Sequence, residues 1–329
     1  MYLPENKPYL YKIGSSTLSN TNLALKKITT EISGTVFSLP YYVARDQGYF
    51  NDLGLEIEFV KRNYGDRPAN ITLIDDHRQV SSFGGPSLFE QGQSTLYRAC
   101  EWGQVRRTYD SSRGGQVIAK RAAIASQAII VRPDSPYNIP QDLANVPVGV
   151  NFHHGSHYIA IQTLEGFLAP EEIKVVHIEG GGQHKQFNRF VALRDGLVDA
   201  VAVMEPWITV AEKLGYKIIA EAHYVGLEIA SPDLDEESFE AINKAIRRAV
   251  QDLQTDPIRY TKYLIDDVSE EIVKLEPSDF RRNRLRYNDP APYSETDFHR
   301  TYNWMVKWGL IQPDATFQQI VDNRVIAAN

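Results

Sequence analysis

Residues 40–60 read PYYVARDQGYFNDLGLEIEFV, and this stretch decides which fold class suits the chain. Its first half, Pro40 to Phe50, repeats apolar side chains at helical spacing, and Gly48 stands near the point where that pattern stops. Its second half, Leu55 to Val60, alternates apolar and polar residues, as a half-buried strand does. A short helix that feeds an edge strand is a unit of α/β architecture.

The same alternation of strands and helices continues along most of the chain. We predict strands at residues 79–83, 95–100, 128–132, 146–151, 174–178, 199–204 and 216–220, and helices at 88–92, 158–168, 186–194 and 208–214. Beyond Pro232 the pattern is helical, with helices expected at 238–253, from 257 onward and at 301–308. The sequence therefore predicts an α/β fold with a helical C-terminal region.

Length and composition exclude several classes of protein. A chain of 329 residues holds about two domains of roughly 150 residues each, and its 43% hydrophobic and 23% charged residues are typical of a soluble globular protein. The one cysteine, Cys100, excludes an intramolecular disulfide. A formal charge of -7 with dispersed Lys and Arg argues against a nucleic-acid partner. No run approaches the roughly 18 apolar residues of a membrane span.

The first twelve residues, MYLPENKPYLYK, bear on where the protein is located. They contain no basic n-region, no continuous apolar segment and no small-residue cleavage site, which are the marks of a secretory signal peptide. We therefore expect a cytoplasmic protein if Met1 is the native start. If a leader was removed, we expect a periplasmic or other extracytoplasmic one.

Loops that follow a predicted strand and precede a predicted helix are the candidate binding loops. There are five of them: Thr35 to Tyr41, Phe83 to Ser87, Asn151 to Tyr158, Glu179 to Lys185 and Met204 to Trp207. In α/β sheets, ligands bind outside the carboxyl ends of the strands, where backbone N–H groups at helix N-termini favour anions. We expect these loops to converge on one cleft that binds a small organic anion.

The order and spacing of four segments carry a family resemblance. The segments are Pro40 to Val60, Phe83 to Ser87, Ile130 to Val150 and Asp199 to Trp207. Together they resemble the type II periplasmic-binding-protein superfamily, in particular the solute-binding proteins for nitrate, taurine and alkanesulfonates and the related thiamine-pyrimidine synthases.

This resemblance implies a two-lobe α/β fold with the ligand cleft between the lobes. One lobe would comprise residues 1–131 plus 227–329, which include the C-terminal helices, and the other residues 132–226. The crossings between lobes would lie near Arg132 to Pro136 and near Glu221 to Gly226. Members of the superfamily share the scaffold, while some deliver ligands to transporters and others catalyse reactions.

Two reactions known in the superfamily are not carried over by the residues present. The hydroxybiphenyl sulfinate desulfinase, which is similar in layout, has its nucleophilic cysteine in the loop before the first helix, where this chain has Gly34-Thr35-Val36. Its arginine before the Phe-Gly-Gly segment is matched here by Ser82. The pyrimidine synthases carry a cysteine cluster, which one cysteine cannot supply.

Histidines are the main candidates for chemistry. His153, His154 and His157 surround a predicted helix start, where imidazoles would contact an anion, transfer protons or ligate a metal, or simply pack the loop. His184 follows three glycines that would let backbone amides approach a ligand. Cys100 closes a predicted strand and would be either a nucleophile or a buried inert thiol. We take His154, His157, His184 and Cys100 as candidate catalytic residues.

The candidate ligand contacts come from the same loops. They are Thr35, Tyr41, Phe83, Gly84, Gly85, Ser87, His153, Ser156, Tyr158, Glu205 and Trp207. The aromatic side chains would stack on a planar ring, and the serines would donate hydrogen bonds to its acid group. Arg106, Arg107 and Arg113 are further candidates for holding a carboxylate, or are exposed surface residues.

Two functions from different classes follow from these residues. The first is a cytoplasmic enzyme that converts a small, aromatic or heteroaromatic organic acid by hydrolysis, decarboxylation or desulfination, with histidines as acid and base. The second is an ABC-transporter-type solute-binding protein for an organic or sulfonated anion. We expect no metal and no cofactor, and a monomer or homodimer; a third reading, a histidine consumed as in the pyrimidine synthases, would require pyridoxal phosphate.

Overall fold

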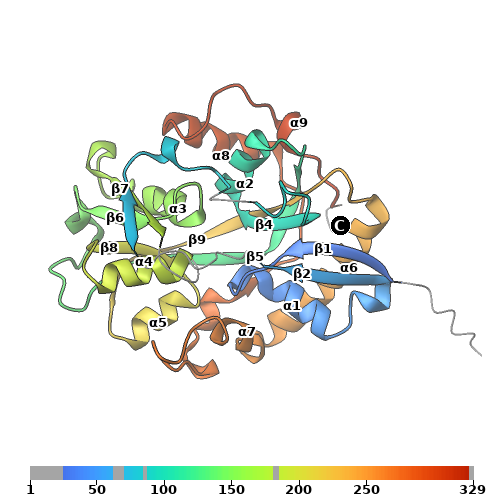
Figure 1. Ribbon diagram of the computed structural model, residues 1–329, viewed down its shortest axis with the longest axis horizontal. Coiled ribbons are helices and arrows are strands. Elements are labelled where there is room, and N and C mark those ends of the chain that lie inside the picture. Colours follow the sequence, from blue (N-terminus) through green and yellow to red (C-terminus); the bar gives the residue numbers. More distant parts are fainter. Residues whose placement is uncertain (1–24, 62–69, 84–86, 181–184, 326–329) are drawn as a thin grey trace, which may run out of the picture.

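In the computed structural model, which describes residues 25–61, 70–83, 87–180 and 185–325, helices pack on a mixed β-sheet (Figure 1). The described strands are β1 Lys26–Glu31, β2 Leu55–Val60, β3 Ile71–Ile74, β4 Leu96–Cys100, β5 Gln116–Val131, β6 Pro147–Val150, β7 Lys174–Gly180, β8 Ala200–Met204, β9 Lys217–Ala230 and β10 Arg286–Tyr287. They follow the order β2-β1-β4-β9-β5-β8-β6-β7-β3, with β10 paired to β5. The α/β fold class is confirmed.

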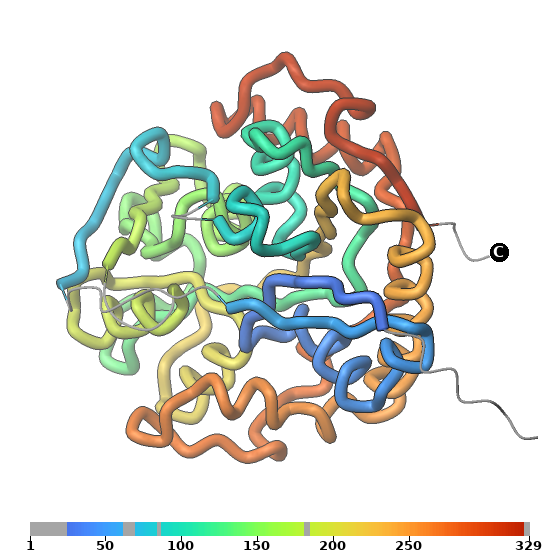
Figure 2. The backbone as a smooth tube through the Cα atoms, turned by 45° about the vertical axis from the view of Figure 1, so that its right-hand side comes forward, coloured from blue at the N-terminus to red at the C-terminus, as the bar shows by residue number. Residues whose placement is uncertain are grey.

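The helices lie between these strands in the chain and cover the sheet. They are α1 Leu39–Asp46, α2 Glu101–Asp110, α3 Gly155–Leu164, α4 Lys185–Arg194, α5 Trp207–Lys213, α6 Glu236–Thr255, α7 Lys262–Ile265, α8 Glu295–Lys307 and α9 Phe317–Ile320. Helix α6 begins where Asp235 accepts a hydrogen bond from Ser238 N, and its predicted apolar stripe from Phe239 to Leu253 is buried. Figure 2 shows the red C-terminal segment lying against the teal segment that contains α2. Among the described residues, no helix is long and apolar enough to span a membrane.

Two long antiparallel strands join the two halves of the sheet. Strand β5 pairs with β9 from Gln116 to Val131, and the register shifts between Lys120 and Ile124. On one side of this shift the strands lie beside β4, and on the other they lie beside β8. The change from one half to the other therefore falls within β5 itself, several residues before the expected crossing near Arg132.

Strand β3 departs from the expected division of the chain. Residues 1–131 were assigned to the first lobe, yet Ile71 to Ile74 pair antiparallel with residues 177–180 of β7, at the far edge of the second half (Figure 1). Helix α8 and the residue after it reach the end of α3, where the indole N–H groups of Trp304 and Trp308 donate to Glu165. Residues 71–74 and the C-terminal region thus contact elements of the second half, namely β7 and the end of α3.

Two predicted elements between β3 and β4 are wrong. Residues 79–83 form no strand: His77–Gln79 is a short 3-10 turn, and the carbonyl of Ser82 accepts from Arg107 Nε instead of a neighbouring strand. Residues 88–92 form turns, not a helix. Ser87 does accept from Glu90 N, but Gly92 has a φ of 75° and ends the turn at once.

Candidate functional site

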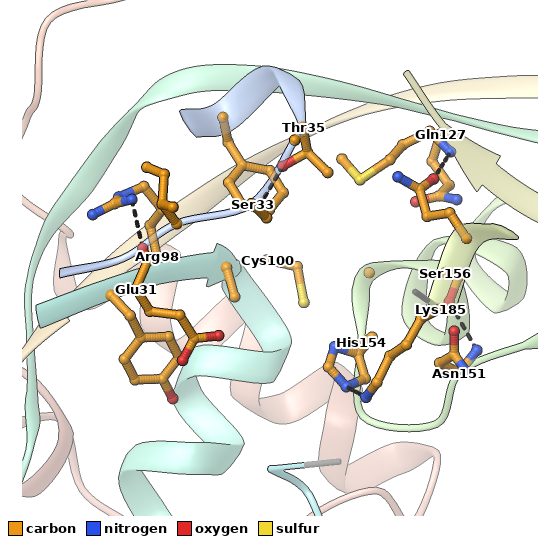
Figure 3. A pocket seen from close by; sticks show the side chains of 18 of the residues that line it. Glu31, Ser33, Thr35, Arg98, Cys100, Gln127, Asn151, His154, Ser156 and Lys185 are labelled. Carbon is orange, nitrogen blue, oxygen red and sulfur yellow. Dashed lines mark hydrogen bonds between the residues drawn. The ribbon is translucent and has the colours of Figure 1, made fainter. Parts of the chain in front are cut away.

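A cavity of about 460 Å³ lies between the two halves of the sheet (Figure 3). Its wall comes from the segment after β1, the end of β4, the loop between β6 and α3, the start of α4, and the acidic pair Asp266 and Asp267. The loops that end strands of both halves therefore meet at one place, as the sequence predicts for an α/β sheet. Strands β5 and β9 contribute Gln127 and Tyr224 to the wall.

Helix α3 starts at the cavity. Its first residue, Gly155, has no room for a side chain, because a Cβ there would lie 2.7 Å from Tyr224 Oη. Ser156 follows on the cavity wall, and its hydroxyl accepts a hydrogen bond from Asn151 N that closes the loop before the helix. The positive end of the α3 dipole therefore faces the cavity, which favours an anion there.

His154 lies on the wall between two cationic side chains. Arg107 Nη2 is 3.0 Å from its Nδ1. Lys185 Nζ is 2.6 Å from its Nε2, the contact drawn in Figure 3. Arg107 is held in place by two carbonyl groups, since its Nε donates to Ser82 O and its Nη2 to His153 O. This part of the cavity wall, around His154, therefore carries net positive charge.

A third cation and two amides extend this polar wall. Arg189 donates to Ala202 O and to Asn151 Oδ1, and burial lowers its pKa to about 9, so it stays charged at neutral pH. Gln186 Oε1 accepts from Met204 N, which fixes the orientation of that amide. The Nε2 atoms of Gln127 and Gln186 are buried and have no hydrogen-bond partner among the described residues. Both side chains line the cavity and can donate to a bound acceptor.

The opposite part of the wall carries carboxylates. Glu31, Asp266 and Asp267 all line the cavity. Burial raises the pKa of Asp267 to about 7, against the opposing effect of Lys61. Its carboxyl group packs on the backbone of Gly34, where a Cβ would lie 2.2 Å from Asp267 Cγ. The cavity is thus cationic beside α3 and α4 and acidic beside β1 and residues 266–267.

Four of the predicted site residues line this cavity. Thr35, Cys100, His154 and Ser156 are all on its wall, as is Arg107 from the arginine-rich segment. Gly84, Gly85 and His184 lie outside the described residues. The remaining predicted residues that the structure describes, Tyr41, Phe83, Ser87, His153, His157, Tyr158, Glu205 and Trp207, are absent from the cavity wall.

His153 and His157 lie off the cavity wall, His153 at a backbone position with a φ of 61° and His157 among the buried residues of α3. They join His77 in a triangle of rings with centroids 5.7 to 6.1 Å apart, and His153 Nε2 lies 2.9 Å from His77 O. Burial is the main cause that lowers the pKa of all three. In the part of the chain that the structure describes, no group of three or more His, Cys, Asp or Glu residues could hold a metal ion.

Tyr41, Tyr158, Trp207 and Glu205 are predicted in the cleft but are buried away from it, while Phe83 is half-buried and also off the cavity wall. Tyr41 donates its hydroxyl to Glu228, while the Arg98 guanidinium lies 3.5 Å from its ring centroid. Tyr158 stacks on Trp102 and Trp207 packs on Phe190. Glu205 accepts from Thr209 N and faces Arg284 at 3.5 Å. Tyr41 and Glu205 thus have polar partners within the protein, and the rings of Tyr158 and Trp207 pack on other aromatic residues.

Sequence reasoning missed Lys185, Arg189 and Gln127. Lys185 ends one of the five candidate loops, and a lysine at a loop that binds an anion is the signal that points to it. Arg189 lies one turn further along α4, on the same face. Gln127 belongs to the part of β5 that the sequence pattern did not predict, so no signal pointed to it.

Comparison with known proteins identifies the fold. No family model and no curated protein matches the sequence. The solved structure of the alkanesulfonate-binding protein SsuA from Xanthomonas axonopodis pv. citri, bound to MOPS, is similar with a TM-score of 0.64 at 13% identity, over 88% of this chain and 94% of that one.

Two further structures are similar over most of their length. A Candida albicans protein described as having the generic periplasmic-binding-protein fold gives a TM-score of 0.62 at 15% identity, over 93% of this chain and 99% of that one. The desulfurization enzyme DszB gives 0.56 at 14% identity, over 91% and 97%. Binding proteins and an enzyme thus share this scaffold, and at these identities the likeness establishes the fold alone. The chain has the periplasmic-binding-protein fold.

Proposed function

We propose that the protein binds a small organic anion, with a carboxylate or sulfonate head, in the cavity between the two halves of its sheet. The observation that carries this proposal is the position of His154 between Arg107 and Lys185. A neutral imidazole has one lone pair and one N–H, so it cannot accept from cationic donors at both nitrogens. Two cationic side chains therefore crowd one imidazole on the cavity wall, and a bound anion beside the ring would balance their positive charge.

Other groups on the wall support the same ligand chemistry. The first turn of α3 and the amides of Gln127 and Gln186 offer neutral donors beside the cations. The rings of Phe37, Tyr97 and Tyr224 add apolar surface for the body of the ligand. A volume of about 460 Å³ lies within the range of small-molecule sites. Since a similar structure is that of an alkanesulfonate-binding protein bound to MOPS, sulfonates are the first ligands to test.

The test is calorimetric titration with short alkanesulfonates, MOPS and aromatic carboxylates. Lys185→Gln removes the ammonium group beside His154 and should weaken binding at least about tenfold, the loss of ~1.4 kcal/mol from a charge-assisted hydrogen bond. Lys174→Gln is the matched control, because that exposed lysine lies at the start of β7 and donates to Glu171 O. If no anion binds, or if Lys185→Gln binds as tightly as the native protein, the proposal is wrong.

A second candidate is an enzyme that uses the bound acid as substrate, by hydrolysis, decarboxylation or desulfination. The observation that favours it is that His154 faces the cavity with a cation at each nitrogen, which suits proton transfer at a bound ligand. His157 has no such place, because it is buried beside Phe152 outside the cavity wall. Liquid chromatography with mass spectrometry measures turnover of aromatic acids and sulfinates. Turnover should be lost in His154→Gln and kept in His299→Gln, which changes an exposed residue of α8. Turnover that survives in His154→Gln would refute the assignment to His154.

Localisation and assembly follow from which candidate holds. A transport-linked binding protein would be extracytoplasmic and an enzyme of this kind cytoplasmic, and we expect a monomer or homodimer in both cases. Cell fractionation and light scattering measure these two properties directly.

A further inference from the structure

The Cys100 thiol lies in the middle of the cavity wall, between the cationic and the acidic parts (Figure 3). It ends β4 and is the N-cap residue of α2, a helix of ten residues. The N–H of Gly103 in the first turn of that helix donates to the sulfur. A Cβ at Gly103 would lie 2.7 Å from the sulfur, so this approach requires glycine. Sulfur at a helix N-terminus is an arrangement that stabilises a thiolate.

A second helix also begins at this cysteine. A Cβ placed on Gly155, the first residue of α3, would lie 3.4 Å from Cys100 Cβ. The positive ends of the α2 and α3 dipoles therefore meet around one side chain. Both helices have ten residues and both are well packed, so this electrostatic environment is built into the scaffold.

Arg121 provides an independent observation at the same place. It is 3% exposed, its Nε donates to Ala123 O, and its guanidinium also interacts with the hydroxyl of Tyr224. Nη1 and Nη2 are buried, and among the described residues neither has an acceptor within ordinary hydrogen-bond distance. Its guanidinium carbon lies 4.6 Å from the ring centroid of Phe37 and 5.2 Å from that of Tyr224, two residues of the cavity wall. Buried donors without partners are costly, and negative charge on the nearby sulfur or on a ligand would relieve that cost.

The charges around Cys100 act in opposite directions. Burial has the largest effect and raises the pKa of the thiol, while Arg107, the Gly103 N–H and Arg121 lower it. Glu101 adds to the effect of burial, so the pKa of the thiol lies above its ordinary value. A bound anion would also disfavour the thiolate, so the two guanidinium groups and the Gly103 N–H are the groups that favour the charged sulfur.

We propose that Cys100 is a nucleophile that attacks an electrophilic carbon of an organic acid bound in the cavity. This inference rests on the proposed function, because the acid group has to be held by the cationic wall. In the step, a bond forms between sulfur and carbon while the bond from that carbon to its leaving group breaks. The leaving group departs with the electron pair, and the thiol proton passes to water. The ligand class is a small carboxylic or sulfonic acid with a leaving group near the acid.

The experiment compares alkylation of the native protein by iodoacetate and iodoacetamide. Since Cys100 is the one cysteine of the chain, peptide mapping by mass spectrometry separates its modification from alkylation of histidine, lysine or methionine. Iodoacetate carries the acid group, whereas iodoacetamide lacks it. We expect the ratio of their rates to exceed the ratio measured with glutathione by about tenfold, equivalent to ~1.4 kcal/mol of preference for the anion. An alkanesulfonate that binds by calorimetry should slow the iodoacetate reaction.

The role of the Arg121 guanidinium is tested with two variants. Arg121→Gln should reduce the preference for iodoacetate, and Arg194→Gln, which removes an exposed arginine paired with Asp195, should not. If Arg121→Gln fails to fold, protection by the sulfonate remains as the test. A glutathione-like rate ratio, or labelling only in urea, would overturn the role of Cys100. If alkanesulfonates bind but the thiol shows no preference, this inference alone fails; if no anion binds, the proposed function fails as well.

Discussion

His153 allows one prediction to be worked through in numbers. Burial is the largest cause that lowers its pKa, from 6.5 to about 4, and the neighbouring Arg106, His77 and Arg107 act in the same direction. Only the hydrogen bond to the carbonyl of His77 opposes this shift. Because the folded-state pKa lies below the unfolded one, the unfolded chain binds the proton more readily. His153 therefore contributes stability that is present at neutral pH and is lost as the pH falls from about 6.5 toward 4.

The size of this effect follows from the two pKa values. Between pH 7 and pH 5 the free energy of unfolding should fall by about 2 kcal/mol through His153 alone. Buried Glu205 and Asp267 act in the opposite direction, since burial raises the pKa of each to about 7 and their protonation favours the folded state. The pH dependence of the total free energy of unfolding therefore does not report on His153 alone. A variant at this position is needed to isolate its contribution.

The isolating variant is His153→Asn, because asparagine tolerates the positive φ of 61° at this position. Urea unfolding at pH 7 should show a variant less stable than the native protein, and the deficit should shrink by about 2 kcal/mol at pH 5, where the native protein has lost the contribution of His153. His299→Asn on the exposed face of α8 is the matched control and should show no such change. If His153→Asn is less stable than the native protein by the same free energy at both pH values, the lowered pKa of His153 does not contribute to stability.

Two further changes test the scaffold around the cavity. Gly155→Ala should destabilise the fold by about 1–3 kcal/mol and weaken anion binding, because its Cβ would meet Tyr224 Oη at 2.7 Å. Thermal unfolding measures the first effect and calorimetry the second, and unchanged values for both would contradict this packing. Glu228→Gln should lower the free energy of unfolding by about 3–5 kcal/mol, because it leaves Arg98 buried without the carboxylate that lies 3.1 Å away. A decrease below about 1 kcal/mol in urea unfolding would show that the pair is not buried in solution.

The periodic part of the fold was predictable from the sequence because it is local. The strands ending at Cys100 and Met204 and the helices α4 and α6 lie within a few residues of their predicted places. Strand β3 was not predicted, because residues 71–74 become a strand through pairing with β7, about a hundred residues away. The strand predicted at 79–83 does not form, and a long-range contact is again involved: the carbonyl of Ser82, which a strand would pair with a neighbouring strand, accepts from Arg107 Nε.

The candidate site was predictable as a set of loops but not residue by residue. His153 and His154 are neighbours in the sequence, yet the first contacts the carbonyl of His77 and the second contacts Lys185 on the cavity wall, a difference that the sequence alone does not reveal. Tyr41 lies in a candidate loop, yet its hydroxyl finds Glu228 on β9, a partner far away in the chain. The side chains that face the cavity depend on such long-range contacts, whereas the place where the loops meet depends on the sheet.

Anion binding beside His154 is tested most directly by an experimental structure of the protein with an alkanesulfonate bound. We expect one sulfonate group in the cavity, within about 3 Å of Lys185 Nζ and beside His154 and the first turn of α3. A sulfonate bound elsewhere, or a ligand in the cavity with its acid group beside Glu31 and Asp267, would contradict it.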